Sequence, residues 1–377
     1  MTDKPFDALG YVKGLRRGFT TGTCAHAAAK AAAAMLVSGR IIPEITVKLD
    51  RGQEITLPTV DAEVKAGSAV CGIKKESGDD IDVTDGTLIF AEVCFTDENG
   101  TVTIEGGPGI GRVTKAGLPV PEGEWAINPT PRRMITGDLS ALLPPGRGFR
   151  VVITAPGGAE LAGKTWNPRL GIEGGISIIG TTGVVEPKSS AAFKASIESY
   201  IKVAAVQDKN CLHIVSGYVG EKYLRENHHI PRDRIIAVGD HVGHAIDTCI
   251  EAGVRRITLC GHIGKWSKLA AGLFNTDSRY GDARLETIAA CAGAAGAAPE
   301  TIRQILNLRL AEASVEILKE KHLTEAFDIM SRRIYDRCSI RAEKKMDFLI
   351  EILTLKGEVL GSFGAGQGGE GWARFTS

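Results

Sequence analysis

Hydrophobic and polar positions follow two different patterns along the chain, and the first is that of an α+β domain. Residues 23–38 combine strong helix formers with threonine caps before them and Gly39 after them, which predicts a helix. From 44 to 104, short β-branched runs such as EITVKL and GTLIFAEVCF alternate with turn sequences, which predicts antiparallel strands. Glycine and proline are too dense in residues 106–135 for regular structure. We therefore predict an α+β domain with mainly antiparallel sheet over residues 1–186.

The second half of the chain alternates apolar strand candidates with helical segments. The strand candidates read CLHIVSG, RIIAVGD, RITLCGH and FLIEILTLKG, and helical segments such as SSAAFKASIESYIKVAAV and HAIDTCIEAG stand before or between them. This alternation is typical of a parallel, doubly wound sheet with right-handed crossovers. We predict a Rossmann-like α/β domain over residues 187–360, so that the whole chain combines an α+β with an α/β domain. Residues 361–377 are rich in glycine and are predicted to form a loose tail.

Charge and cysteine usage exclude several classes of protein. Lysine plus arginine and aspartate plus glutamate both number 45, so no global field attracts nucleic acid or an acidic membrane. The sequence has no run of about eighteen apolar residues, the length that a membrane span requires. The 8 cysteines form no Cys-x-x-Cys pair and lie mostly in apolar runs, which favours reduced thiols and a cytoplasmic location. Arg16 and Arg17 precede an alanine-rich segment as in a twin-arginine export signal, but His26 and Lys30 interrupt its apolar run.

Two glycine-rich stretches match nucleotide-binding patterns. Residues 158–165, GAELAGKT, match the P-loop pattern and follow the predicted strand FRVVITAP. A P-loop needs a helix that begins at its lysine, whereas the helix-breaking sequence NPRLG follows Lys164 within a turn or two. A nucleotide-binding loop therefore stays an alternative. The glycines at 364, 366 and 369 have dinucleotide-binding spacing, but too few residues follow them to form the required helix.

The carboxyl ends of the predicted parallel strands are the expected ligand site, because open α/β sheets bind ligands there. At these ends the sequence places a glycine beside a polar side chain three times, as SGY, GDH and GHIGK. Glycine lets a ligand approach the backbone, the Asp240 carboxylate can accept a ribose hydroxyl, and the N–H groups of a helix that opens at Gly264 can hold a carboxylate. The residues predicted to bind a cofactor are Gly217, Gly239, Asp240, Gly261 and Gly264.

Two pairs of histidines suggest a metal site as an alternative. His241 and His244, and likewise His228 and His229, are spaced as metal ligands can be. A third ligand of suitable spacing accompanies neither pair in the sequence. We therefore predict no protein-held metal.

Basic residues gather next to glycine, threonine and asparagine, as an acceptor-rich ligand requires. Threonine hydroxyls accompany the first cluster at the amino end of the predicted helix, where the positive end of the helix dipole also favours anions. The residues predicted to bind an anionic substrate are Arg16, Arg17, Thr20, Thr21, Thr23, Lys164, Arg169, Lys265, Lys268 and Arg279.

Five segments in order resemble the signature segments of the CbiD family: TTGTCAHAAAKAA, GGPGIGRVTKAGL, AINPTPRRMI, KTWNPRLGIEGGISIIGTTGVVEP and GHIGKWSKLAAGLFNTDSRYGDAR. The resemblance extends over most of the chain and implies a cobalt-precorrin-5B C(1)-methyltransferase of oxygen-independent cobalamin synthesis. It implies S-adenosylmethionine as methyl donor and a cobalt-containing tetrapyrrole as acceptor, with cobalt only as part of the substrate. Asp277 and Gly281 depart from the family pattern, which has histidine and alanine at these places.

The chemistry that the resemblance implies needs no side-chain nucleophile, because holding donor and acceptor at attack distance while excluding water can supply the rate. Asp240, His262 and Asp277 are the candidates for acid-base assistance. The implied partner is a small-molecule tetrapyrrole, with no nucleic acid or membrane, while a homo-oligomer and transient contacts with neighbouring pathway enzymes stay open. The alternatives from other classes are a P-loop phosphotransferase that uses residues 158–165 and a non-catalytic corrinoid carrier.

Overall fold

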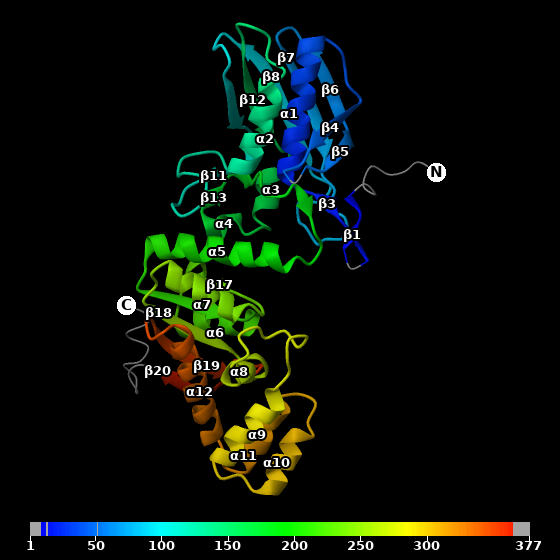
Figure 1. Cartoon of the computed structure of the whole chain (residues 1–377). Helices are drawn as coiled ribbons and strands as arrows, with labels where there is room; N and C mark the ends of the chain where they lie inside the picture. The colour runs from blue at the N-terminus through cyan, green and yellow to red at the C-terminus, as the bar shows by residue number, and fades with distance from the viewer. Residues whose placement is uncertain (1–8, 13, 51, 365–377) are drawn as a thin grey trace. The chain divides into compact units, whose positions relative to one another are not determined.

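The computed structural model describes residues 9–12, 14–50 and 52–364. The chain divides into two compact units, Met1–Ser190 and Ala191–Ser377, and each unit mixes helices with sheet around its own hydrophobic core (Figure 1). Within the described residues, no helix combines the length and the apolar character that a membrane crossing would need.

The first unit is built on a five-stranded sheet in the order β6-β7-β8-β12-β9. Neighbouring strands in it are antiparallel except for β12 and β9, and β4 and β5 form a separate antiparallel pair. The strands of this unit are β1 (Tyr11–Val12), β2 (Leu15–Arg16), β3 (Gly18–Phe19), β4 (Glu44–Lys48), β5 (Glu54–Pro58), β6 (Val60–Lys65), β7 (Ser68–Lys74), β8 (Leu88–Thr96), β9 (Val102–Gly106), β10 (Gly109–Ile110), β11 (Arg112–Val113), β12 (Gly148–Thr154), β13 (Ile172–Glu173), β14 (Gly175–Ile176) and β15 (Val184–Val185).

Helix α1 (Thr21–Ser38) packs against β7, β8 and helix α2 (Pro129–Ser140). All of its alanines except Ala34 are buried, and their small side chains let the helix lie close to the sheet. Thr20 caps the amino end by accepting the Thr23 N–H at 3.2 Å, and Gly39 ends the helix in the left-handed conformation with φ of 67°. The predicted helix is confirmed and begins two residues earlier than expected.

The glycine-rich segments of the first unit pack against one another through close backbone contacts. Strand β10 pairs with β14, and α3 (Gly158–Ala162) packs against both. A Cβ on Gly109, whose φ is +83°, would lie 1.8 Å from the carbonyl oxygen of Ala155. A Cβ on Gly158 would lie 2.3 Å from the carbonyl oxygen of Gly109. The segment predicted to lack regular structure contains two-residue strands, because glycine permits backbones to approach this closely. The prediction was wrong for its last residues, where α2 begins at Pro129, because proline fits the first turn of a helix.

The second unit contains a five-stranded sheet in the order β17-β16-β18-β19-β20. The first four strands are parallel, and β20 is antiparallel to β19. The strands are β16 (Cys211–Val215), β17 (Ile235–Ala237), β18 (Arg256–His262), β19 (Asp347–Leu353) and β20 (Val359–Gly364). The helices are α5 (Ser190–Gln207), α6 (Tyr218–Asn227), α7 (Val242–Glu251), α8 (Ile263–Ala270), α9 (Arg284–Ala294), α10 (Pro299–Leu306), α11 (Ala313–Glu320) and α12 (Glu325–Arg341).

Strand β20 corrects the prediction that chain from Gly361 onward is loose. Its residues pair with β19 as far as Gly364. A Cβ on Gly361 would lie 2.6 Å from the backbone of Phe327, so this glycine serves the packing of β20 against α12. The rest of the predicted tail, including the glycines at 366 and 369, lies outside the described residues.

Candidate functional site

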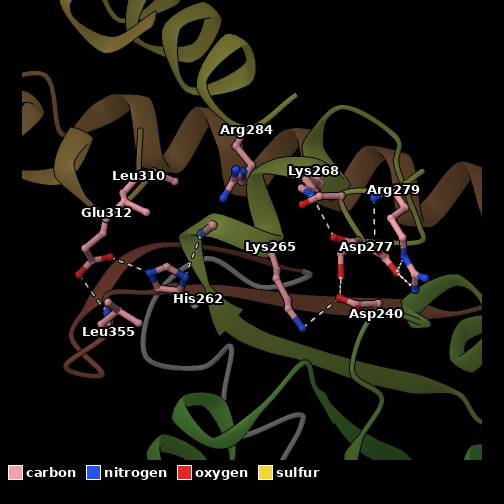
Figure 2. Close-up of a pocket in the computed structure, with 14 residues that line it drawn as sticks. Asp240, His262, Lys265, Lys268, Asp277, Arg279, Arg284, Leu310, Glu312 and Leu355 are labelled. Carbon is pink, nitrogen blue, oxygen red and sulfur yellow. Dashed lines mark hydrogen bonds and ion pairs between the residues drawn. The ribbon is translucent and has the colours of Figure 1, made fainter. Parts of the chain in front are cut away.

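A cavity of about 570 Å³ lies at the carboxyl ends of the parallel strands in the second unit (Figure 2). Its volume is typical of sites that bind small molecules or cofactors. Strand β18 leads directly into α8, so that His262 both ends the strand and caps the helix. The lining residues are Asp240, His262, Gly264, Lys265, Lys268, Thr276, Asp277, Ser278, Arg279, Arg284, Leu310, Ala311, Glu312 and Leu355.

Asp240 follows β17 and is held at the cavity by two donors. Its Oδ1 accepts a hydrogen bond from the Thr276 hydroxyl at 2.8 Å and lies 3.1 Å from the Lys265 Nζ. Burial by itself would raise the pKa of Asp240, but the hydrogen bonds from Thr276 and Lys265 outweigh it and lower the pKa below the ordinary value. The site therefore contains a carboxylate that is ionised at neutral pH.

His262 is bonded through both ring nitrogens. Its Nδ1 accepts the Gly264 N–H at 3.1 Å, so the ring proton belongs on Nε2, which donates to Glu312 Oε2 at 2.7 Å. The other oxygen of Glu312 accepts the Leu355 N–H at 3.0 Å (Figure 2). In this arrangement neither ring nitrogen keeps a free lone pair, and the acid-base role of His262 stays a prediction.

Lys268 holds the loop that closes another side of the cavity. Its Nζ is buried and donates to the Thr276 carbonyl at 2.9 Å and to the Ser278 hydroxyl at 3.0 Å. In the same loop the Asp277 carboxylate accepts the Arg279 Nε–H at 2.9 Å. This contact with Arg279 lowers the pKa of Asp277 to about 2. The cavity therefore presents charges of both signs, most of them already paired.

The cavity gathers many of the residues that the sequence predicted and several that it did not. The predicted residues are Asp240, His262, Gly264, Lys265, Lys268, Asp277 and Arg279; the others are Thr276, Ser278, Arg284, Leu310, Ala311, Glu312 and Leu355. Glu312 lies just before α11, and Leu355 lies in the turn after β19. No local pattern marks either position, because their place at the cavity depends on packing between distant segments.

Three glycines predicted to bind a cofactor do not line this cavity. Gly217 precedes α6, and Gly239, with φ of +56°, turns the chain before Asp240. A Cβ on Gly261 would lie 3.0 Å from the Ser216 Oγ. Gly239 and Gly261 thus have structural reasons to be glycine, while their contact with a cofactor stays a prediction.

The predicted threonines of the first unit join α1 to the segment 177–183. The Thr21 hydroxyl donates to the Ser177 carbonyl at 3.0 Å and accepts the Ile179 N–H at 2.9 Å, and the Thr23 hydroxyl donates to the Gly183 carbonyl at 2.8 Å. Thr20 acts as the helix cap described above. These contacts explain the hydroxyl-rich sequence structurally, and its contact with substrate stays a prediction.

The predicted basic residues of the first unit lie in separate surroundings. Arg16 lies 4.0 Å from Glu76, and Arg17 donates to Glu186 at 3.0 Å. The guanidinium of Arg169 lies over the Trp166 ring, 4.7 Å from its centroid. Lys164 is exposed.

Lys164 does not begin a helix. Helix α3 ends at Ala162, and the next helix, α4 (Asn167–Leu170), is only four residues long. The backbone N–H groups of Lys164 and Thr165 already donate to carbonyls of α3. Residues 158–165 therefore lack the geometry of a phosphate-binding P-loop.

Comparisons with known proteins cover nearly the whole chain. The family models CbiD and CbiD, C-terminal domain, match residues 10–187 and 275–363. The cobalt-precorrin-5B C(1)-methyltransferase of Moorella thermoacetica is 44% identical over 352 residues, which cover 93% of this chain and 95% of that protein. The chain belongs to the CbiD family.

Other relatives and a solved structure carry related names. The cobalt-precorrin-5B C(1)-methyltransferase of Clostridium perfringens is 41% identical over 338 residues, which cover 90% of this CbiD chain and 91% of that protein. The crystal structure of the cobalamin biosynthesis protein (cbiD) from Archaeoglobus fulgidus is 30% identical, with a TM-score of 0.38, and the match covers 70% of this chain and 83% of that one.

Only some of the residues that line the cavity lie within the segments matched by the CbiD family models. The lining residues from Thr276 onward fall within the C-terminal match, whereas Asp240 and the residues from His262 to Lys268 lie between the two matched segments. In the described part of this CbiD chain, no group of three or more His, Cys, Asp or Glu side chains is arranged to hold a metal ion.

Proposed function

We propose that this protein transfers the methyl group of S-adenosylmethionine to carbon 1 of cobalt-precorrin-5B, giving cobalt-precorrin-6A, in anaerobic cobalamin biosynthesis. The observation that carries this proposal is the 44% identity to the Moorella thermoacetica methyltransferase across 95% of that protein. Cobalt enters only as part of the substrate. The free cysteines favour the reducing cytoplasm as the place of the reaction.

The cavity of the second unit supports a site for the methyl donor. S-adenosylmethionine carries a carboxylate, an ammonium, a sulfonium and ribose hydroxyls, so a cavity with charges of both signs complements it better than one of a single sign. Asp240 uses Oδ1 for Thr276 and Lys265, which leaves Oδ2 for a ribose hydroxyl. The amino end of α8 lies where it can hold the carboxylate of the donor.

The strand arrangement supports the same placement. Parallel strands that end in glycine turns, with the cavity beyond their carboxyl ends, match the way in which doubly wound, Rossmann-like domains bind nucleotides. We infer that the second unit is a domain of this class and that Gly217, Gly239, Gly261 and Gly264 let the donor approach the backbone.

The reaction is a displacement at the methyl carbon. The bond between sulfur and the methyl group breaks with its electron pair left on sulfur, which becomes a neutral thioether. The ring carbon supplies the pair for the new carbon–carbon bond, and the positive charge passes from the sulfonium to the macrocycle. The protein acts by holding the two reactants at attack distance and excluding water. The proposed reaction therefore uses no side chain as a nucleophile.

Anionic groups of the macrocycle require cations. Lys265 and Arg279 can meet some of them at the cavity, whereas the buried Lys268 Nζ already donates to Thr276 and Ser278 and acts through the loop that it holds. Arg16, Arg17, Lys164 and Arg169, with the threonines of α1, stay substrate contacts that the sequence suggests. Replacing Arg16 or Arg17 with alanine tests the latter set through the KM for the corrinoid.

The decisive experiment is anaerobic incubation of the purified protein with methyl-labelled S-adenosylmethionine and cobalt-precorrin-5B. We expect the corrinoid to gain the mass and the label of one methyl group. The variant Asp240→Asn should bind the donor more weakly, because an amide that keeps its oxygen toward Thr276 and Lys265 places an NH₂ donor where Oδ2 would accept the ribose hydroxyl. An unmodified corrinoid would overturn the proposal.

Two controls separate the alternatives. A corrinoid carrier would bind the tetrapyrrole but give no binding heat with S-adenosylmethionine. A P-loop enzyme would bind ATP and lose that binding in Lys164→Ala, whereas we expect the reaction to need no ATP.

A further inference from the structure

Two leucine side chains stand exposed at the mouth of the cavity. Leu310 is 64% exposed and Leu355 is 60% exposed, and both line a cavity whose other lining residues are polar or charged except Gly264 and Ala311. They lie on either side of Glu312 (Figure 2). Single exposed leucines are common, but two that share the rim of one cavity form an apolar edge that a ligand can cover.

The backbone around these leucines is held in place by Glu312. One carboxylate oxygen accepts the Leu355 N–H at 3.0 Å, and the other accepts the His262 Nε2–H at 2.7 Å. Leu310 precedes Glu312 by two residues, and Ala311 between them is buried. The two leucine-bearing segments are thus fixed to the end of β18 by hydrogen bonds that leave both leucine side chains exposed.

The turn that carries Leu355 is itself well defined. It joins β19 to β20, and the Gly357 N–H closes it on the Thr354 carbonyl at 3.1 Å with φ of +86° at Gly357. Because β18 and β19 are parallel neighbours with His262 opposite Leu353, this turn lies at the same sheet edge as the cavity. Leu355 therefore stands at the ligand-binding edge because of the sheet topology.

Cations line the cavity next to this edge. Figure 2 shows Lys265 and Arg284 between the leucine side and the loop of Asp277 and Arg279. The Arg284 guanidinium is paired with Asp282 at 2.7 Å, and Lys265 with Asp240. The rim thus combines an apolar edge with positive charge, which suits a ligand with an apolar face and an anionic border.

We propose that Leu310 and Leu355 form the surface on which the acceptor macrocycle lies, with its carboxylates toward Lys265 and Arg284. This proposal rests on the proposed function and names the part of the site that meets the acceptor. A flat conjugated ring with an acid-bearing border matches the edge in both polarity and charge. A ring in this position would bring its carbon to a methyl group presented from inside the cavity.

The test compares Leu310→Ser, Leu355→Ser and the double variant with Ile340→Ser. Ile340 is a matched control, because it is 68% exposed on α12 and does not line the cavity. Anaerobic visible-absorbance titration measures the Kd for cobalt-precorrin-5B, and calorimetry measures the Kd for S-adenosylmethionine. We expect the double variant to weaken corrinoid binding about tenfold or more. The Kd for the donor should rise by much less than the Kd for the corrinoid, and Ile340→Ser should change neither value.

The outcomes separate this inference from the proposed function. A folded double variant with unchanged corrinoid affinity overturns the docking surface, even when the wild-type protein transfers the methyl group. A failure of the wild-type protein to bind the corrinoid, or an equal loss in Ile340→Ser, overturns it as well. Weakened corrinoid binding in the double variant, together with no methyl transfer by the wild-type protein, would support the surface and reject the proposed activity.

Discussion

The imidazole of His262 and the carboxylate of Glu312 meet at 2.7 Å, although 50 positions separate them in the chain. The same ring caps α8 through its other nitrogen, so one side chain connects the end of β18, the start of α8 and the segment before α11. The geometry of the cavity rim depends on this connection, because Leu355 is bonded to the same carboxylate.

The variant His262→Ala should lower the free energy of unfolding by about 1 kcal/mol, because α8 loses its cap. His262→Asn should lose less, since an asparagine side chain can accept the Gly264 N–H in place of Nδ1. Urea denaturation followed by circular dichroism measures both values. Equal losses in the two variants would contradict the capping role.

Thr21 offers a test of why the threonine-rich turn exists. Thr21→Val removes the donor to the buried Ser177 carbonyl and the acceptor of the Ile179 N–H, so we expect the free energy of unfolding to fall by about 1–3 kcal/mol. Thr21→Ser keeps the hydroxyl and should lose less. If the hydroxyl instead serves the substrate, Thr21→Val will raise the Kd for the corrinoid and leave the urea midpoint unchanged.

The free energy of unfolding should fall as the pH is lowered below the ordinary pKa of histidine, about 6.5. Burial lowers the pKa of His213 to about 3, so this ring stays neutral in the folded protein while it takes up a proton in the unfolded chain. The unfolded state therefore binds more protons between about pH 6.5 and 3, and folded stability decreases as pH falls through that window. From pH 7 to 5 the loss due to His213 is about 2 kcal/mol.

Urea denaturation at several pH values measures this dependence. His213→Gln should flatten the pH profile, whereas His229→Gln, at an exposed histidine, should leave its slope unchanged. A profile of the same slope in His213→Gln would show that the dependence arises elsewhere, for example at His26, whose pKa burial also lowers.

The local sequence pattern was enough to predict an element when the residues of that element mark it as a helix or a strand. Helix α1 combines helix formers with a threonine cap and a glycine stop, and the four parallel strands are apolar runs bounded by turns. Strand β20 has no such signal, because its glycines are required by close contacts, of Gly361 with α12 and of Gly364 with β19, rather than by local conformation. The interpretation of that segment as a loose tail failed for this reason.

The site could be predicted in part. Asp240 follows β17 and His262 ends β18, and the rule that ligands bind at strand ends selected them together with Lys265. Glu312 and the two rim leucines could not be selected in this way, since they lie in turns that the sequence does not connect to the sheet edge.

The amino-acid sequence by itself determined the alternation of elements, the resemblance to the CbiD family and the polar residues at the strand ends, because each of these is carried by contiguous residues. Only the tertiary structure decided which polar groups are used within the fold. It paired the hydroxyls of Thr21 and Thr23 with backbone groups about 160 residues away, and it placed Glu312 between His262 and Leu355. Hydrogen bonds form between atoms that are close in space, and no sequence pattern specifies that closeness for segments so far apart in the chain.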